Sequence, residues 1–273
     1  MNIYIVVCVY TLSPAYIKKW FKLHLHNTKY KLIIVDNNLR RQITDPTVII
    51  GTNTLNEFSA YNEGLQLIKK EFEDEYDIIL MLNDTLFTRH NAKFFLKHLL
   101  KYKNTVARLS IPAICGRIDP YNNICYRNPW SNDTGYISSF CIIMNKPARD
   151  LYLKLLSDIS PTFPFADSVT ELLNWSTHID RRFKEFVISH LIDTDTATVW
   201  YQSKNNIKNI ERLNVKGKCV FLEHYVSGNI SKHGVLVSIF PTWKQKTQHF
   251  IYEQIAKMER KLLSILKFKV GSK

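Results

Sequence analysis

Several residue patterns are scarce or missing in this chain of 273 residues, and each gap removes a class of protein. The five cysteines are odd in number and show no CxxC spacing, so the sequence indicates neither a zinc site nor a disulfide scaffold, and a reducing cytoplasm fits best. The eight glycines and nine prolines are scattered, without repeats or low-complexity stretches. A solenoid, a propeller and a disordered linker are therefore not expected.

Long apolar runs and glycine-rich loops are also missing. No segment reaches about 20 apolar residues, and the apolar start MNIYIVVCVYTL has no basic leader, so we expect neither a membrane span nor secretion. No GxGxxG or GxxxxGK(S/T) loop follows a strand-like run, which weakens a dinucleotide fold and a P-loop NTPase. The length predicts one catalytic-size domain with an appended tail.

Positive charge is present in excess, with 37 Lys and Arg against 24 Asp and Glu and a formal net charge of +13. Such a chain suits nucleic acid, an anionic membrane surface or a phosphorylated substrate. The aromatic residues fall mostly at core-like spacings, and no RNP-like, helix-turn-helix or zinc signature is present. We therefore expect no nucleic-acid partner. A basic nucleic-acid-binding protein is the alternative class of function.

Short apolar runs alternate with amphipathic segments in the first half of the chain. Such runs are typical of strands covered on both faces. The segments between them have helical signals, among them Ser13 followed by Pro14 as a helix start. The predicted strands are IYIVVCVY (3–10), KLIIVDNN (31–38), TVIIGTN (47–53) and YDIILMLND (76–84). The alternation predicts an α/β fold with a mostly parallel sheet.

Polar residues follow each of these predicted strands. They are Thr11, the run Asp36 to Asn38, the pair Thr52 and Asn53, and the run Asn83 to Thr85. Ligands of open parallel sheets bind at the carboxyl ends of the strands. The sequence therefore predicts a binding site at this edge.

Four motifs carry a resemblance to a known family. IIVDNN, NEFSAYNEGL and ILMLNDT resemble the nucleotide-sugar-binding half of a GT-A glycosyltransferase. ILMLNDTLF followed by GYISSFCIIMNK is similar to bacterial rhamnan-synthesis-type polysaccharide transferases, over roughly residues 1–190. The resemblance implies a mixed, mostly parallel sheet flanked by helices in a domain over 1–242, with a donor half at 1–110, an acceptor half at 111–242 and a helical tail at 243–273. It also implies a nucleotide-sugar donor and a glycan or lipid-linked glycan acceptor.

The resemblance assigns a metal role to Asp84. A hard cation such as Mn²⁺ or Mg²⁺, held by carboxylate oxygens, would neutralise the departing diphosphate. Leu82 stands where the first Asp of the common Asp-x-Asp motif would be, so the need for a metal stays open. A late histidine completes the metal site in several such enzymes, which makes His224 a second candidate ligand. The alternatives are a helix cap or Asx turn at Asn83 and Asp84, and a buried structural histidine.

Further polar residues are candidates for binding the donor. Asp36 could accept hydrogen bonds from the base or ribose, or could simply form a turn. Residues in NEFSAYNEGL open a helix, whose N-terminus favours phosphate. The sequence predicts a short strand ahead of Glu223 and His224, and then a lid or a plain loop at SGNISKHG. The predicted donor-binding residues are Thr11, Asp36, Asn38, Glu57, Ser59, Asn62, Asn83 and Lys232.

An inverting transfer needs a base to deprotonate the acceptor hydroxyl. Glu185 is favoured because RRFKEFVISHLI is similar to a Glu-containing helix of the family, and Asp167 also qualifies by position. The alternatives are that each is a solvated surface residue, or that the transfer retains configuration and needs no base. A sugar-nucleotide-binding protein without turnover is a further alternative.

The tail 243–273 is basic and amphipathic. Eight Lys and Arg against Glu253 and Glu259 give it a formal charge of +6, and its apolar residues recur at helical spacing. Such a helix could lie on the anionic inner face of the cytoplasmic membrane. The alternative is that it packs its apolar stripe on the domain or on a second subunit as a homodimer.

Overall fold

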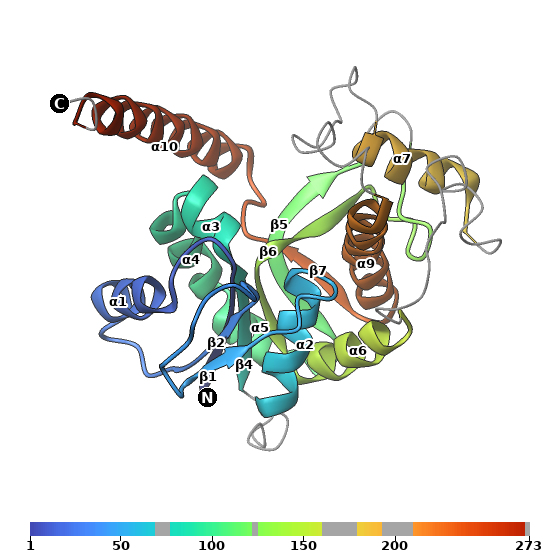
Figure 1. Cartoon of the computed structure of the whole chain (residues 1–273). Coiled ribbons are helices and arrows are strands. Elements are labelled where there is room, and N and C mark those ends of the chain that lie inside the picture. Colours follow the sequence, from blue (N-terminus) through green and yellow to red (C-terminus); the bar gives the residue numbers. More distant parts are fainter. Residues whose placement is uncertain (69–76, 122–124, 160–178, 193–209, 271–273) are drawn as a thin grey trace.

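The structure is a computed structural model that describes residues 1–68, 77–121, 125–159, 179–192 and 210–270. A sheet of seven strands has the order β3-β2-β1-β4-β6-β5-β7 (Figure 1). The predicted α/β class with a mostly parallel, mixed sheet is confirmed. The strands are β1 (Ile3–Val9), β2 (Lys31–Asp36), β3 (Val48–Ile50), β4 (Ile78–Asn83), β5 (Ala113–Pro120), β6 (Gly135–Asn145) and β7 (Val235–Ser238).

The four predicted strands of the first half form one parallel block. β1 pairs with β2 on one side and with β4 on the other, and β3 extends the block beyond β2. The chain therefore winds outward in one direction from β1 to β3 and then crosses back to β4. Between β1 and β4 the strand order reverses, and such a switch point leaves a crevice at the carboxyl ends of the strands.

The other half of the sheet is mixed. β6 runs antiparallel to both β4 and β5, and β7 pairs parallel with β5. β6 contains the motif GYISSFCIIMN, eleven residues long, which reaches from the core to the edge where β4 ends. This strand carries Ser138 and Ser139 to that edge, beside the predicted binding site.

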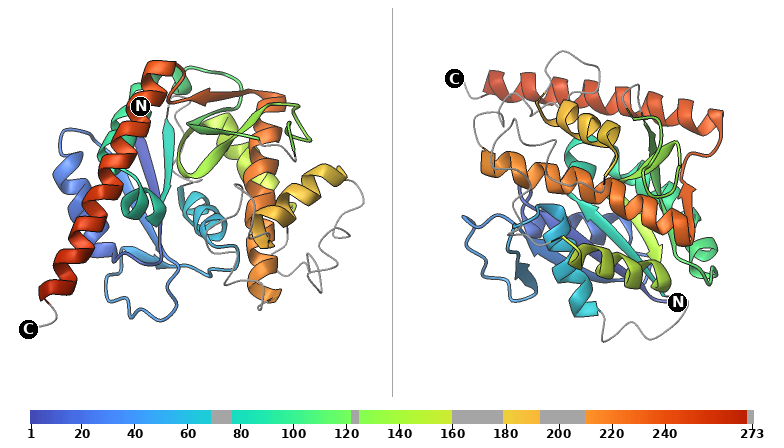
Figure 2. Two further views of the ribbon diagram at one scale, coloured as in Figure 1. Left: turned by 90° about the horizontal axis from the view of Figure 1, so that it is seen from above. Right: turned by 90° about the vertical axis from the view of Figure 1, so that its right-hand side faces the viewer.

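Helices cover both faces of the sheet, as the pattern of continuous apolar strands requires. The buried side chains form two clusters, one under α2, α6, α7 and α9 and the other under α1, α3, α4 and α5 (Figures 1 and 2). The helices are α1 (Pro14–His24), α2 (Glu57–Ile68), α3 (Asp84–Arg89), α4 (Ala92–Lys101), α5 (Lys103–Ala107), α6 (Lys146–Ser157), α7 (Arg181–Ile192), α9 (Ile210–His233) and α10 (Trp243–Val270).

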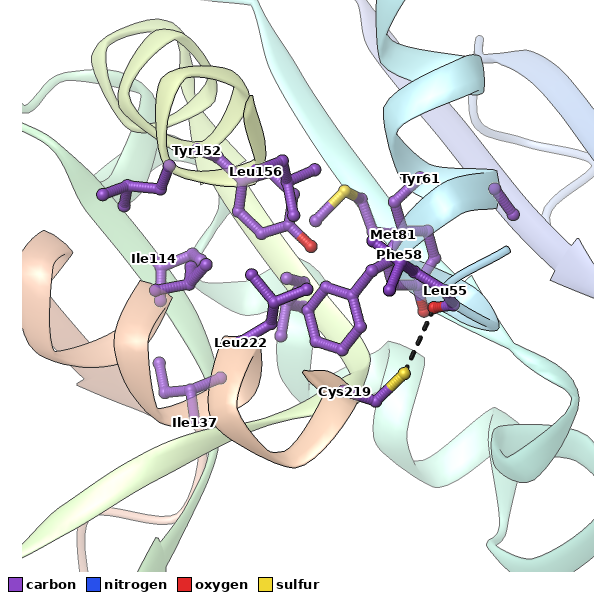
Figure 3. Packing of buried hydrophobic residues seen from close by; sticks show 14 of the residues in the cluster. Leu55, Phe58, Tyr61, Met81, Ile114, Ile137, Tyr152, Leu156, Cys219 and Leu222 are labelled. Carbon is purple, nitrogen blue, oxygen red and sulfur yellow. Dashed lines mark hydrogen bonds between the residues drawn. The ribbon is translucent and has the colours of Figure 1, made fainter. Parts of the chain in front are cut away.

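The first cluster joins segments that are far apart in the sequence. Figure 3 shows the ring of Phe58 from α2 beside Leu222 of α9, and the Cys219 thiol donates to the carbonyl oxygen of Leu55 at 3.3 Å. Burying an aliphatic or aromatic side chain of this size stabilises a fold by about 1.5–3 kcal/mol. This packing holds α9 against the start of α2, at the edge where the predicted site lies.

The sequence interpretation of the α9 region is wrong. A strand was expected ahead of Glu223, and a loop was expected around Lys232, but α9 is one continuous helix over both. Leu222, Val226 and Ile230 are buried at intervals of four residues, which is the spacing of one face of a helix. The apolar stretch VFL at 220–222 was too short to distinguish helix from strand.

In the part of the chain that the structure describes, no helix combines the length and the apolar character that crossing a bilayer requires.

Candidate functional site

A cavity of about 620 Å³ opens at the switch point between β1 and β4. Its wall combines the loop after β1, the loops after β2 and β3, the start of α3 and the first turns of α9. Polar residues dominate it, as the strand ends predicted. They include Thr11, Asn37, Asn53, Asn56, Asp84 and Lys216.

Asp84 holds the loop after β1 through one oxygen. Its Oδ2 accepts backbone N–H groups from Tyr10 at 2.8 Å, from Leu12 at 3.2 Å and from Thr11 between them. Its Oδ1 is buried and has no hydrogen-bond partner among the described residues. Burial raises the pKa of Asp84, and the three backbone donors and Arg41 partly offset that rise. The carboxylate is therefore firmly placed and keeps one oxygen for a proton or a cation.

Asn83 caps a helix, as one of the sequence alternatives proposed. It is the N-cap of α3, and its side-chain oxygen accepts the backbone N–H of Thr85 at 3.0 Å. This satisfies one of the unpaired donors at a helix start. Asn83 nevertheless lines the cavity, so capping fixes its position in the wall.

Asp36 supports the site from behind. Its buried carboxylate forms an ion pair with Arg41 at 2.6 Å and accepts the backbone N–H of Asn38 at 2.9 Å. Arg41 also donates to the carbonyl oxygens of Leu12 at 2.9 Å and Tyr10 at 3.0 Å. Asp36 is not among the residues that line the cavity, and both of its oxygens are engaged. The predicted contact of Asp36 with a base or ribose is replaced by a turn that anchors Arg41.

Asn37 lines the cavity, whereas Asp36 and Asn38, which were predicted to bind the donor, do not. Its amide donates to the carbonyl oxygen of Asn56 at 2.7 Å, while its Oδ1 is buried without a partner among the described residues. A Cβ at Gly51 would approach that oxygen to 2.1 Å, so only glycine at this position leaves Asn37 its space. The neighbouring Asn38 instead donates to the carbonyl oxygen of Tyr10 at 3.1 Å.

The start of α2 contributes one of its three predicted residues. Glu57 lines the cavity and accepts the Ser139 hydroxyl at 3.2 Å. Ser59 donates its hydroxyl to the carbonyl oxygen of Asn56 at 2.8 Å, within the same helix start. Asn62 lies one turn further along and accepts from Gln66 at 3.5 Å. Ser59 and Asn62 are not among the lining residues.

A second cavity of about 860 Å³ adjoins the first. The two share Glu57, Asn83, Thr85 and Lys216 in their walls. The rest of the second wall comes from the end of α3 with His90, and from β5, β6, α9 and α10. The tail, predicted as an appendage, therefore forms part of the site.

Glu223 lines this second cavity from α9. Its Oε1 accepts the backbone N–H of Ser139 at 2.6 Å. Burial and the negative charges of Glu57 and Asp119 raise its pKa to about 7, against the opposing effect of the Ser139 donor. A carboxyl group with this pKa exchanges a proton readily at neutral pH, which is what a general base or acid needs. Sequence reasoning missed it because the contact with Ser139 spans 84 residues of chain.

Glu185, the favoured catalytic residue, does not line either cavity. Glu185 is on the exposed side of α7, where it pairs with Arg181 at 2.9 Å one turn earlier. This is the solvated surface role that was its alternative. Asp167 lies outside the residues that the structure describes.

His224 and Lys232 are also placed away from the first cavity. His224 is buried, its Nδ1 lies 2.9 Å from the Tyr121 hydroxyl, and its ring packs 4.0 Å from that of Tyr136. It is not among the residues that line the cavity of Asp84. Lys232 is in the last turn of α9, sixteen residues after Lys216 and therefore roughly 24 Å along the helix. That distance exceeds the reach of a lysine side chain.

Metal ligands are sparse at the site. Within the described ranges, no three His, Cys, Asp or Glu side chains are grouped so that they could hold a metal ion. A cation here would need oxygen ligands from a bound substrate besides that of Asp84. Comparison of the sequence with protein-family models and with curated proteins gave no match.

Proposed function

We propose that this protein is a GT-A glycosyltransferase that moves a sugar from a nucleotide-sugar donor to a glycan or lipid-linked glycan. The observation that carries the proposal is the pair of adjoining cavities at the switch point, with a fixed carboxylate, Asp84, in one and a proton-accepting carboxyl group, Glu223, in the other. Two substrates that exchange a group need two such neighbouring sites. The strand order and the resemblance of the motifs add support.

The first cavity suits the donor. Arg212 and Lys216, from the first turns of α9, bring positive charge to a wall that also holds the carboxyl groups of Glu57, Asp84 and Glu211. A diphosphate bound together with a divalent cation suits such a mixed wall. The unpaired Oδ1 of Asn37 and the neighbouring asparagines offer hydrogen-bonding groups for a base or ribose. Asn37 thus takes the role first assigned to Asp36.

A divalent cation fits this site in one way. The unpaired, buried Oδ1 of Asp84 is a suitable single ligand, and Mg²⁺ is commonly bound by one or two carboxylates together with substrate phosphates and water. His224 is not part of this proposal. When bound, the cation would stabilise the negative charge of the departing diphosphate. Asp84 would be fixed for that task by its three backbone hydrogen bonds.

The second cavity suits the acceptor. An acceptor hydroxyl beside Glu223 would give its proton to the carboxylate as its oxygen attacks the anomeric carbon of the donor sugar. The bond from that carbon to the diphosphate oxygen breaks, and the nucleotide leaves with the electron pair. This step inverts the anomeric centre and gives Glu223 the role first assigned to Glu185. We place the enzyme in the cytoplasm, which the five buried, free cysteines fit.

Donor binding tests the proposal before any acceptor is known. A panel of UDP-, GDP- and dTDP-sugars should include a donor that raises the melting temperature, and more so with Mg²⁺, because a ligand that binds the folded state stabilises it. Asn37→Ala should weaken the shift, whereas Asn62→Ala, a matched change outside the cavity, should leave it intact. If no sugar nucleotide changes the melting temperature with or without metal, the proposal fails.

A second candidate function is sugar-nucleotide binding without turnover, which the donor cavity alone would support. Glu223 favours the enzyme, because a half-buried carboxyl group with a pKa of about 7 in a neighbouring cavity serves proton transfer and is not needed for binding alone. Donor binding without hydrolysis or transfer of the sugar would favour the second candidate.

A further inference from the structure

Helix α10 turns its apolar residues away from the protein. Glu253 and Ala256 are buried on its inner side, and Glu253 accepts from His90 of the segment between α3 and α4 at 3.0 Å. Ile251, Ile255 and Met258, spaced as one helical face, are 51%, 46% and 65% exposed. The sequence alternative in which the apolar stripe packs on the domain is therefore wrong for these three residues. We call them the outer face of α10.

Exposed basic residues lie on α10 and on the helix that packs against it. Lys244 and Lys261 of α10 are exposed, and Lys244 precedes Ile251 by seven residues on the same helical face. The adjoining helix α4 adds Lys93, Lys97 and Lys101, which are exposed at intervals of four residues. The two helices touch through Phe94 and Tyr252, whose rings stack with centroids 4.5 Å apart. Figure 2 shows α10 running along the periphery of the molecule. An exposed apolar strip and exposed lysines are thus carried by two helices that pack against each other.

We propose that the outer face of α10, with the lysines of α10 and α4, docks on the surface of an anionic lipid bilayer. Apolar side chains with flanking lysines are what an interfacial helix needs, because the chains enter the acyl boundary while the lysines meet lipid phosphates. A second copy of the protein is a poorer partner, since a symmetric contact over this face would bring like-charged lysines together. Charge complementarity therefore selects the membrane.

The same helix connects this surface to the second cavity. Phe250, Gln254 and Lys257 of α10 line that cavity, so one side of the helix faces the acceptor site while another faces outward. Docking would place the mouth of the acceptor site beside lipid headgroups. The proposal gives the acceptor a class, a glycan on a lipid carrier, and this part rests on the proposed function. Bilayer binding itself does not, because it needs no donor.

Sedimentation with lipid vesicles tests the proposal on the full chain. At low salt, the protein should sediment with vesicles containing phosphatidylglycerol but not with vesicles of phosphatidylcholine alone. High salt should release it, because salt screens the charge attraction. Lys93→Gln, Lys97→Gln and Lys101→Gln together should weaken binding by about 100-fold. The matched control Lys19→Gln, Lys22→Gln and Lys29→Gln removes equal charge from exposed positions elsewhere and should bind more tightly than the α4 variant.

A second variant tests how much the apolar residues of the outer face contribute to vesicle binding. Ile251→Ser, Ile255→Ser and Met258→Ser together should lower binding at least about tenfold. Leu23→Ser, Leu39→Ser and Leu67→Ser, which also remove exposed apolar residues, should leave it unchanged. Failure to sediment with anionic vesicles at low salt, or equal binding by the α10 variant, would overturn the proposal. A dimer seen by light scattering that the α10 variant abolishes, without vesicle binding, would assign the face to a second copy instead. Donor thermal shifts in the same samples report separately on the proposed function.

Discussion

Asp84 and Glu223 carry the same functional group in adjoining cavities, but their surroundings differ. Asp84 receives three backbone N–H groups on one oxygen and lies near Arg41, whereas Glu223 receives one backbone N–H and lies near Glu57 and Asp119. Burial raises both pKa values, and only at Glu223 do neighbouring negative charges add to that rise. Hydrogen-bond donors and nearby positive charge therefore oppose the rise of the pKa at Asp84, whereas nearby negative charge adds to it at Glu223.

The largest expected effect comes from removing the charge at the first carboxylate. Asp84→Asn should lower sugar transfer by about 10³-fold or more, because a neutral amide is a poor ligand for the cation that would stabilise the departing diphosphate. Donor-dependent Mg²⁺ binding, measured by calorimetry, should disappear as well. Asp45→Asn, at a carboxylate that pairs with Lys18 away from the cavities, is the control. Full activity and an unchanged metal response in Asp84→Asn would remove Asp84 from the reaction.

The second carboxyl group should be sensitive to pH. The rate of transfer should rise as the pH passes about 7 and level off above it, since only the carboxylate form of Glu223 can accept the acceptor proton. Glu223→Gln should lower kcat by about 10²–10³-fold, remove this pH dependence and leave donor binding unchanged. Glu185→Gln should be close to wild type. A Glu223→Gln enzyme with the wild-type pH profile would show that another group is the base.

The ion pair of Arg41 and Asp36, which holds the loop beside Asp84, can be removed separately. Arg41→Met should lower the free energy of unfolding by about 3–5 kcal/mol, because it leaves the buried Asp36 carboxylate without its ion pair. Urea denaturation at pH 7 measures this loss. Arg40→Met, at the exposed neighbouring position, should change stability by less than about 0.5 kcal/mol. Equal stabilities for the two variants would contradict the structural role of the Arg41 and Asp36 pair.

The raised pKa of Glu223 should also appear in stability. A carboxyl group whose pKa is higher in the folded state favours folding when protonated, so its stabilising contribution is present below about pH 4.5 and is lost as the pH rises to about 7. Glu223→Gln, which stays neutral, should therefore be more stable than wild type at pH 8, by at most about 3 kcal/mol. The difference should vanish near pH 4. Urea unfolding at both pH values would detect this difference in stability. A difference that does not change with pH would argue against a raised pKa of Glu223.

The sequence predicted the parts of the site that depend on local pattern. Apolar runs identified β1, β2 and β4, and the rule that parallel sheets bind at their carboxyl ends placed Asp84 in a cavity wall. The roles of Asp36 and Asn37 could not be assigned in this way. Both follow the same strand, and only the position of Arg41 and the space left by Gly51 decide which of them faces the cavity.

The second cavity could not be predicted from local pattern. Glu223 meets Ser139 across 84 residues of chain, and α10 reaches the cavity because it packs on the segment around His90 and on α4. Glu185 was favoured from a similar helix, but α7 presents it to solvent. Contacts between distant segments depend on tertiary packing, which periodicity and short motifs do not encode.

The central claim is that a sugar leaves a nucleotide donor where the two cavities meet. The direct measurement is release or transfer of label from radiolabelled UDP-, GDP- and dTDP-sugars with Mg²⁺ by the wild-type protein, with and without membrane lipid extract as a source of acceptors. The account predicts turnover of at least one donor, faster with the extract, and its loss in both Asp84→Asn and Glu223→Gln while the folded state and donor binding of Glu223→Gln persist. A wild-type protein that binds a sugar nucleotide but releases no sugar from any donor, with or without extract, would contradict it.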